Sequence, residues 1–486
     1  MLPRLLSFAL PLSVYTALVF VGWGVYRERK KLDRWVLILV AGAFTVSLAF
    51  RPSEHLLFFD EDIYIQIASN LSHAPVAQLT LLGGPGDIQA STYYKEPAGF
   101  PVILSLILAI TGTHEMVAFI VARLLYAMAV AAVYLLGREV LKTRAQAIAA
   151  AITFAATPAC FAYSASAGTD LPAALFAALG IWGIAAGNGM LALGGLAMAS
   201  MVRLEMIALA SLILIGNRIP SKWKFGLGGL LIPEIAHVGW VFSIAPLLVK
   251  VEHVESAFSP VYILRNLREN IAYLFDPRAF PITGAIAAII GILKAKEFRI
   301  ILLGWMAIFF CVYLVFYAGS FDINPRYSIQ LTIPIILLAV SATERLPFLL
   351  AIAIAAALPS MRPWQLPAYV QALASDHRTA VEFAQAVGPT DLVVSGEPEI
   401  FMNNGRHGMN AVYATDQIDR LRSQFGKYKR IFYYGGIRTN EIGSERWEAD
   451  RKVKSEFELH LIEAKEFSAF RIAIYELLQP IHREAG

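Results

Sequence analysis

Long runs of apolar residues, separated by short polar loops, cover the first three quarters of the chain. Such runs predict membrane-embedded helices, because one span needs about 20 apolar residues. Several runs are shorter, and short helices are stable in a bilayer only where neighbouring helices shelter their ends. We therefore expect an α-helical integral membrane protein with about a dozen spans. The apolar runs are 5–26, 35–50, 115–137, 146–165, 171–187, 190–203, 205–217, 225–248, 279–293, 298–318, 327–342 and 346–359.

Lys and Arg are concentrated in alternate loops between these runs. Positive loops of this kind usually face the cytoplasm, so the first large loop, 51–97, and a later loop, 249–278, are expected to face outward. The N-terminal run lacks a small-residue cleavage site and is expected to remain as a helix. The positive loops are RERKKLDR (27–34), GREVLKTR (137–144), NRIPSKWK (217–224) and KAKEFR (294–299).

Two outer segments do not fit the pattern of simple spans. The run FPVILSLILAITG is too short to cross the membrane comfortably, and a crossing there would place GREVLKTR outside. Residues 98–112 are therefore predicted to form a re-entrant or juxtamembrane helix. The loop 249–278 is amphipathic, which is compatible with a mobile lid or an interfacial helix; we favour the interfacial helix.

The pattern changes after Pro359, where charged residues mix with short alternating apolar runs. The runs DLVVSG, RIFYYGG, FELHLIEA and FRIAIYEL predict strands, and SDHRTAVEFAQAV predicts a helix. We expect a transmembrane domain over residues 1–359 and a small, soluble α/β domain outside the cytoplasm over residues 360–486.

The composition agrees with this division and excludes other classes of protein. Apolar residues make up 57% of the chain and charged residues 16%, and the mean hydropathy is +0.57. Both cysteines lie in apolar stretches, so neither a disulfide framework nor a cysteine metal site is expected. The net charge of +4 is small, and the basic clusters follow the topology. No nucleic-acid partner is predicted.

The stretch FFDEDIYIQIASN places Asp60, Glu61 and Asp62 side by side near the membrane. Carboxylates near a bilayer are costly unless they face water or a polar cavity, so they mark a functional site by default. In a helix that begins near Asp60, Tyr64 lies on the same face as Asp60. The alternative is an acidic helix N-terminus that is stabilised by the helix dipole.

Further charged residues are expected at the same level of the membrane. Each one alone is also explained as a helix cap or a membrane anchor, and Arg203 with Glu205 as a mutual ion pair. Together they predict a polar cavity at the outer interface. These residues are Lys95 and Glu96 in YYKEPAGFP, Asp170 in GTDLPAALF, Arg203 and Glu205 in MVRLE, and Arg326 with Tyr327 in NPRY.

Such a cavity admits a lipid from the side and an acceptor from the water. Lys and Arg bind phosphate, and a carboxylate can activate a hydroxyl or an amine. Nucleotide sugars are not generally available outside the cytoplasm, which favours a sugar-phosphate lipid as donor. We expect Asp60 to act as general base, and Lys95 and Arg326 to stabilise the leaving phosphate.

The order of these motifs resembles the C-type glycosyltransferases (GT-C fold) over roughly residues 35–345. The similarity is to the branch that uses polyprenyl-phosphate sugars, which includes protein O-mannosyltransferases and the aminoarabinose transferase of lipid A. The resemblance rests on FFDEDIYIQIA, KEPAGFPVILSLILAITG, GREVLKTR, GTDLPAALF and RYSIQLTIP. The aminoarabinose branch has Glu before Lys at the Pro step, whereas Lys95 precedes Glu96 here, so the individual roles of these two residues are left open.

The resemblance implies an inverting transfer from a polyprenyl-phosphate sugar to a lipid, glycan or protein acceptor. The expected surroundings are the lipids of a bacterial inner membrane, with the active site and the C-terminal domain facing the periplasm. The resemblance implies Asp60, Glu61 and Asp170 as catalytic residues and Arg326 as a ligand of the donor phosphate. From their place in the predicted cavity, Lys95 and Arg203 are also expected to bind the phosphate, and Tyr64, Glu96, Glu205 and Tyr327 to bind substrate.

Some members of that family carry a divalent metal ion near the first acid. The nearby candidates are His55, His73 and His253, but their spacing is not that of a tight site, so no metal ligand is assigned. The alternative function is a transporter or flippase for lipid-linked sugars. Transporters place charges near the middle of the membrane and show internal repeats, whereas this chain has its charges at the outer face and no visible repeat.

Overall fold

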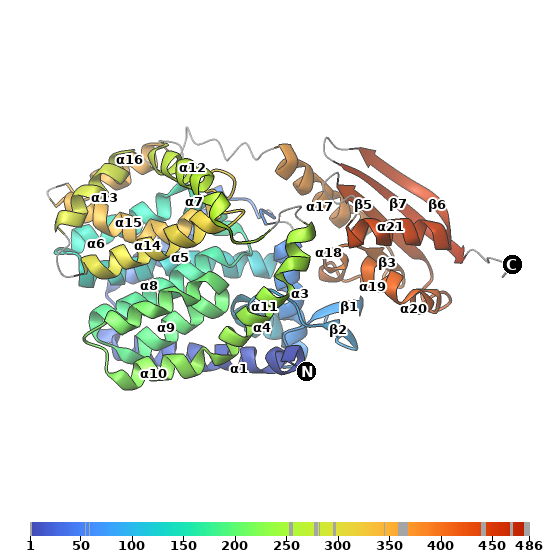
Figure 1. Cartoon of the computed structure of the whole chain (residues 1–486), viewed down its shortest axis with the longest axis horizontal. Coiled ribbons are helices and arrows are strands. Elements are labelled where there is room, and N and C mark those ends of the chain that lie inside the picture. The colour runs from blue at the N-terminus through green and yellow to red at the C-terminus, as the bar shows by residue number, and fades with distance from the viewer. Residues whose placement is uncertain are drawn as a thin grey trace.

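Apolar helices lie side by side in the first part of the chain, and a β-sheet lies at one end of this bundle (Figure 1). The computed structural model describes residues 2–53, 55–57, 59–251, 256–276, 280, 282–294, 298–344, 346–357, 368–438, 444–466 and 470–480.

The bundle is built from α-helices that are joined by short loops and short 3₁₀ helices. The α-helices are α1 (Leu2–Arg27), α2 (Arg34–Phe50), α3 (Phe59–His73), α4 (Gly99–Thr111), α5 (Glu115–Val140), α6 (Arg144–Ala156), α7 (Pro158–Ala162), α8 (Asp170–Ala186), α9 (Gly189–Val202), α10 (Ser221–Leu230), α11 (Ile232–Val251), α12 (Ile263–Phe275), α13 (Ile282–Lys294), α14 (Arg299–Val315), α15 (Ile329–Ala342) and α16 (Leu349–Ala357). The 3₁₀ helices are η1 (Arg29–Lys31), η2 (Tyr163–Ala165), η3 (Leu204–Ile207), η4 (Leu209–Ile215), η5 (Pro260–Tyr262) and η6 (Pro325–Ser328).

Three of the described helices are long and apolar enough to cross a membrane: Leu2–Arg27, Glu115–Val140 and Pro325–Ala342. Two bent pairs raise this number to as many as five if each pair is one span. The expected number of about a dozen spans stays a prediction. The other apolar helices of the described chain are shorter: Arg34–Phe50, Gly99–Thr111, Asp170–Ala186, Gly189–Val202, Leu204–Ile215, Thr283–Lys294 and Arg299–Val315.

Prolines account for the two bends. The pair Arg144–Ala156 and Pro158–Ala165 is bent by 62°, and Pro158 stands at the first position of α7, where it needs no hydrogen-bond donor. The pair Ser221–Leu230 and Ile232–Ile244 is bent by 44°, and Pro233 lies at the start of α11. The predicted helix at 98–112 is present as α4.

Small residues bring α8 and α9 into close contact. A Cβ atom at Gly195 would lie 2.4 Å from the backbone nitrogen of Gly180, and one at Gly183 would lie 2.2 Å from the nitrogen of Ala192. Small residues at such crossings allow helix backbones to approach, which is a common way to stabilise helix pairs in membranes. The pair α8 and α9 therefore forms a tightly packed centre for the bundle.

The sheet has seven strands in the order β2-β1-β4-β3-β5-β7-β6. Strand β3 pairs in parallel with β4 and β5, and the other neighbours pair antiparallel. The strands are β1 (Leu79–Gly83), β2 (Ala90–Thr92), β3 (Leu392–Ser395), β4 (His407–Asn410), β5 (Ile431–Arg438), β6 (Phe457–Glu466) and β7 (Phe470–Pro480).

Helices cover both faces of the central strands, as the apolar run in β3 requires. Leu392 and Val394 pack on the side of α19 and α21, and Val393 packs on the side of α17 and α18. The expected α/β character of the C-terminal region is therefore seen in the structure. The helices of this region are α17 (Ala368–Ala386), α18 (Pro398–Asn403), α19 (Ala411–Asp416), α20 (Ile418–Arg422) and α21 (Glu445–Glu456).

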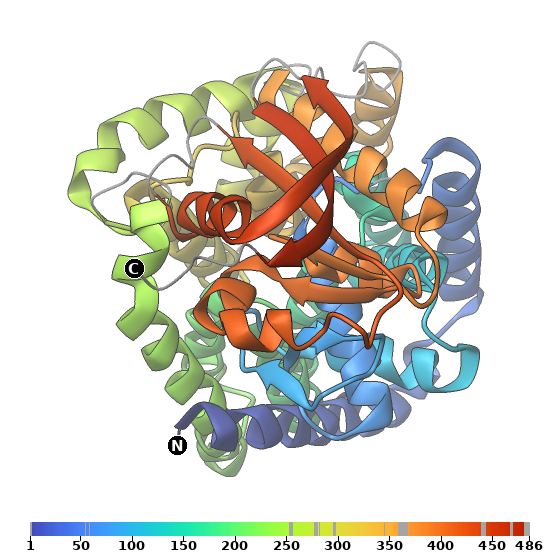
Figure 2. The same ribbon diagram turned by 90° about the vertical axis from the view of Figure 1, so that its right-hand side faces the viewer.

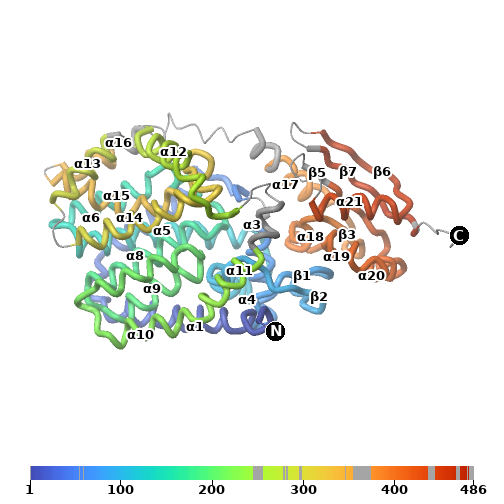
Figure 3. The backbone as a smooth tube through the Cα atoms, in the orientation of Figure 1, coloured from blue at the N-terminus to red at the C-terminus, as the bar shows by residue number. Residues whose placement is uncertain are grey.

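The sheet is not confined to the region after residue 359. Strands β1 and β2 come from the first outer loop, and β1 pairs with β4 through Leu82 opposite Met409 and Gly83 opposite Gly408. Seen from the sheet end, these blue strands lie beside the orange strands and in front of the bundle (Figure 2). The chain trace in Figure 3 shows the same meeting of early and late segments. The sequence did not predict this shared sheet.

The described residues of the loop 249–278, which is predicted to face outward, include η5 and α12. Asn266 donates hydrogen bonds to three backbone carbonyl groups of residues 313–316, and Asn270 donates to Gly319. On the opposite side Leu264 is 79% exposed. This amphipathic arrangement agrees with the expected interfacial helix, which stays a prediction.

The α8–α9 contact predicts a difference between two glycine substitutions. We expect Gly195→Ala to lower the thermal midpoint of the purified protein, because overpacking of a tight contact costs about 1–3 kcal/mol. Gly42→Ala is the matched control, since Gly42 is also helical and nothing lies within 4 Å of a Cβ there. Alanine is the better helix former, so the control should unfold at the same or a higher temperature. Equal midpoints for both variants would contradict the close packing.

Candidate active site

Asp60, in the first turn of α3, faces a cluster of charged side chains. Its Oδ2 lies 3.5 Å from Nη1 of Arg326, and its side chain is 20% exposed. Burial, followed by the nearby Glu96, raises the pKa of Asp60 to about 6, while Arg326 and Lys95 act in the opposite direction. Such a carboxyl group is largely ionised at neutral pH and accepts a proton readily, as a general base must.

Lys95 and Glu96 lie in the same cluster, just before α4. Lys95 Nζ is 3.5 Å from Glu96 Oε1, and the hydroxyl of Tyr64 donates a hydrogen bond of 2.9 Å to Glu96 Oε2. Burial alone would lower the pKa of Lys95, but the Glu96 and Asp60 carboxylates raise it above its usual value. Lys95 is 32% exposed, so it is a charged ammonium that an anion can reach.

Glu61 points away from this cluster and has no exposed surface. Its Oε1 accepts hydrogen bonds from Ser166 Oγ at 2.5 Å and from the backbone N–H of Ala167 at 2.8 Å. Its Oε2 accepts one from the backbone N–H of Leu57 at 3.2 Å. These contacts fix the start of α3 against the chain before α8. They favour a positioning role over the predicted catalytic role.

Asp62 points in a third direction, toward the C-terminal region. Its Oδ2 lies 2.8 Å from Nε2 of His377 in α17, and its Oδ1 accepts a hydrogen bond of 3.0 Å from Asn403 in α18. Burial alone would raise the pKa of Asp62, but His55 and His377 lower it. The ligand atoms of His55, Asp62 and His377 all lie within 4.8 Å of one another, so these residues could hold a metal ion.

Of the three histidines that the sequence singled out, only His55 belongs to this group within the described chain. His73 contacts the carbonyl group of Ser69 in its own helix, and His253 lies outside the described residues. Sequence reasoning missed His377, which is far from Asp62 along the chain and stands in no recognisable motif.

Arg203 lies in a second cluster, where carboxylates on two sides neutralise it. Its guanidinium contacts Asp170 at the start of α8 and Glu205 in η3. Glu205 also accepts a hydrogen bond of 2.9 Å from the hydroxyl of Tyr313. Arg203 is only 7% exposed. The predicted pairing of Arg203 with Glu205 is therefore present, and Asp170 joins it.

The ring of Tyr327 lies between the two clusters. The guanidinium carbon of Arg203 is 5.0 Å from the centre of this ring, and that of Arg326 is 5.3 Å from it. The ring also stacks on Tyr313, with centres 4.9 Å apart and planes inclined by 10°. The charged residues that the sequence placed in one layer thus form two adjoining groups joined by an aromatic ring.

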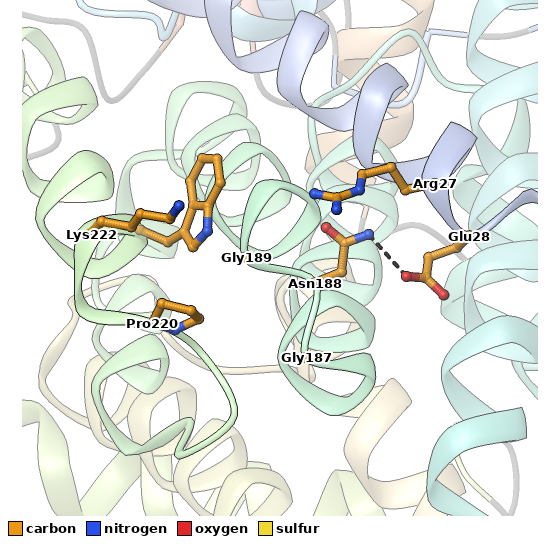
Figure 4. A pocket seen from close by; sticks show the side chains of 8 residues that line it. Arg27, Glu28, Gly187, Asn188, Gly189, Pro220 and Lys222 are labelled. Atoms are coloured by element: carbon orange, nitrogen blue, oxygen red, sulfur yellow. Dashed lines mark hydrogen bonds between the residues drawn. The ribbon is translucent and has the colours of Figure 1, made fainter.

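Two spaces in the described part of the chain differ in size, one beside the second cluster and one away from both clusters. The crevice beside Tyr163 and Asp170 is too narrow to hold a water molecule. A cavity of about 470 Å³ lies at the end of the bundle away from the sheet, where α1 ends (Figures 1 and 4). Arg27, Asn188 and Trp223 contribute to its lining. This cavity lies at the end of the bundle that the sequence predicts to be cytoplasmic, away from the charged clusters.

Part of the chain matches a known family. Residues 95–240 match the model of the family described as dolichyl-phosphate-mannose-protein mannosyltransferase. This segment begins at Lys95 and includes Asp170, Arg203 and Glu205. No curated protein sequence shows significant similarity to the chain.

Solved structures resemble most of the chain. The crystal structure of ArnT from Cupriavidus metallidurans bound to undecaprenyl phosphate is similar, with a TM-score of 0.58 and 13% identity over 90% of this chain and 98% of that chain. Mycobacterial arabinofuranosyltransferase AftD gives a TM-score of 0.48 and 15% identity over 92% of this chain and 40% of that chain. The zinc- and sulfate-bound oligosaccharyltransferase of Archaeoglobus fulgidus gives 0.45 and 13% over 82% and 68%.

The contacts of Glu61 predict that it and its neighbour Asp60 have different effects on stability. Glu61→Ala should lower the thermal midpoint clearly, because each buried donor left without an acceptor costs about 1–3 kcal/mol. Asp60→Asn, next to it on a partly exposed face, should change the midpoint much less. Thermal unfolding of the two purified variants measures the difference. A loss of stability in Asp60→Asn alone would contradict this division of roles.

Proposed function

Because the chain has the fold of the C-type glycosyltransferases, we propose that it transfers a sugar from a polyprenyl-phosphate donor to an acceptor on the outer side of the membrane. The match of residues 95–240 to a lipid-phosphate-sugar transferase family supports this proposal. ArnT, which shares the fold, has been solved with undecaprenyl phosphate bound. The proposed location is a bacterial inner membrane, with the charged clusters facing the periplasm.

The observation that carries the proposal is the position of Asp60 beside two cations. Arg326 lies 3.5 Å from Asp60, and Lys95, which is 3.5 Å from Glu96, acts with Arg326 to lower the pKa of Asp60. All three side chains are partly exposed, between 20% and 32%. A base and two phosphate-binding groups are thus available to substrates in the same place.

The proposed reaction is a single displacement with inversion at the sugar. The acceptor hydroxyl or amine attacks the anomeric carbon, and its proton passes to the carboxylate of Asp60. The bond between the anomeric carbon and the phosphate oxygen breaks, and the electron pair leaves with the polyprenyl phosphate. Arg326 and Lys95 stabilise the negative charge that develops on this phosphate.

The remaining predicted residues are assigned supporting roles. Arg203 is already neutralised by Asp170 and Glu205, so we assign these three to the framework that holds Tyr327 and Arg326 in place. Tyr64 orients Glu96 through its hydrogen bond, and Glu96 in turn contacts Lys95. The acceptor is a lipid, a glycan or a protein. We assign the C-terminal region to shielding the site or orienting this acceptor.

The proposal predicts that Asp60→Asn removes transfer while expression and donor binding persist. Loss of a general base lowers the rate by about a hundredfold to ten-thousandfold. The measurement is incubation of the full-length protein in detergent with a radiolabelled polyprenyl-phosphate sugar and membrane extract, followed by identification of the labelled acceptor. Asp419→Asn is the control, since that side chain is 90% exposed in α20.

Two outcomes of this assay would count against the proposal. Undiminished turnover by Asp60→Asn would remove Asp60 from the mechanism. Movement of the intact donor across proteoliposomes, without any cleavage of the bond between sugar and phosphate, would identify a flippase in place of a transferase.

Arg326→Ala should act mainly on the donor. Loss of a hydrogen bond between charged groups costs about 1.5–3 kcal/mol, so the donor KM should rise by about tenfold to a hundredfold. Arg471→Ala is a suitable control, because Arg471 is 63% exposed in β7. Initial rates at a series of donor concentrations give the KM values. An unchanged donor KM together with a lower folding yield would indicate a structural role for Arg326.

A further inference from the structure

Three side chains from separate parts of the chain meet between the bundle and the C-terminal region. His55 precedes α3, Asp62 lies in α3, and His377 lies in α17. Their side chains are 7%, 1% and 10% exposed. The two imidazole rings lie face to face, with centres 3.8 Å apart and planes inclined by 30°. Among the described residues, this is a group of metal-binding side chains whose ligand atoms lie within 4.8 Å of one another.

One nitrogen in this group has no hydrogen-bond partner among the described residues. Nδ1 of His55 is buried and lies 3.6 Å from Asp62 Oδ2 and 3.3 Å from Glu61 Oε2. In the tautomer whose Nε2–H is donated to Glu115, Nδ1 carries a lone pair, and both of its neighbours are acceptors, which cannot satisfy it. A buried polar atom without a partner requires an explanation, and a bound ion between the nitrogen and the carboxylates provides one.

The surrounding contacts are those that orient metal ligands. Nε2 of His55 lies 2.5 Å from Glu115 Oε1, so an N–H donated to Glu115 leaves Nδ1 free to bind a metal. Oδ1 of Asp62 accepts a hydrogen bond from Asn403, which leaves Oδ2 directed at the two histidines. Ligating histidines commonly donate their second N–H to a carboxylate in this way.

The donor set selects the class of ion. Two imidazole nitrogens and one carboxylate oxygen suit zinc and similar first-row transition metals, with Glu61 Oε2 next to the group. Magnesium and calcium prefer sites made of oxygen atoms alone. The site is also distinct from the proposed catalytic cluster, because Asp60 contacts Arg326 whereas Asp62 contacts His377.

We propose that His55, Asp62 and His377 bind a divalent ion of the zinc class, which ties the C-terminal region to α3. Since Asp60 and Asp62 stand on the same helix, the ion would also fix the position of Asp60; only this consequence rests on the proposed function. The ion acts as a structural clamp and takes no part in bond breaking.

The test measures metal binding by the full-length protein in detergent. The protein is treated with a chelator, dialysed and titrated with Zn²⁺ against a chromophoric competitor. We expect one tightly bound zinc ion per chain and a rise in the thermal midpoint, because a ligand that binds the folded state stabilises it. Mg²⁺ should not produce this rise. Replacement of zinc by Co²⁺ should give visible absorption from an ordered site.

Single substitutions test whether the proposed residues bind the zinc ion. His377→Ala should lose the tight zinc ion, whereas His460→Ala, which changes an exposed histidine in β6 of the same region, should keep it. Asp62→Asn preserves the size of the side chain and should also lose the zinc ion, so it replaces His377→Ala in the test if that variant does not fold. Glu115→Gln should lower zinc affinity by about tenfold to a hundredfold, because Glu115 contacts the ligand His55 and does not contact the ion itself.

The outcomes separate this site from the transferase proposal. Zinc binding that is lost in His377→Ala and in Asp62→Asn supports the clamp whether or not sugar transfer is detected. A wild-type protein that binds no zinc tightly has a hydrogen-bonded histidine pair at this position, and the proposal is then wrong. Equal zinc affinity in wild type and Asp62→Asn would also overturn it.

Discussion

The removal of three consecutive carboxylates from most of their contact with water, at the start of α3, is the constraint on which the sheet end of the molecule depends. Each carboxylate must find its own compensation, because a buried charge without a partner is strongly unfavourable. Glu61 obtains it from backbone and hydroxyl donors, Asp62 from histidines and an asparagine, and Asp60 from Arg326. These partners come from distant parts of the chain, so the contacts of the three carboxylates also bring those parts together.

The division of partners explains why Asp60 is the chemically available member of the trio. Glu61 and Asp62 are almost fully enclosed by their partners, and they fix the helix from two sides. Asp60 retains some exposure and faces a cation that lies at the start of a candidate span. A helix held by its neighbours can present one reactive group with little freedom, which is the requirement for positioning a catalytic base.

The sequence predicted which residues belong to the candidate site better than it predicted which of them contact one another. Asp60, Lys95 and Arg326 were recognisable because charged groups near a bilayer are energetically costly, so their presence there indicates a functional site. The strands β3, β5, β6 and β7 were recognisable from alternation, which is a local signal. The run 205–217 was expected as a span, but its described residues form η3 and η4, because apolar length alone does not fix the helix type.

Contacts between distant segments were not predictable in this way. Nothing in the local pattern of residues 79–92 shows that they extend a sheet made mostly of residues after 391. Likewise, His377 stands in an ordinary amphipathic helix, and its pairing with Asp62 depends on how α17 docks. Hydrophobic periodicity reports which face of an element is buried, but it does not report against which element.

The C-terminal region is consequently attached to the outer loop at two places of different chemistry. The β1–β4 ladder supplies backbone hydrogen bonds, and the group around Asp62 supplies charge and side-chain contacts. Both attachments, through Asp62 in α3 and through β1, belong to the stretch of chain that runs from α3 through Lys95 to α4. A displacement of the C-terminal region therefore moves α3, which carries Asp60, and β1, which precedes Lys95. The position of the proposed base and its cations is in this way coupled to the docking of a region that supplies none of them.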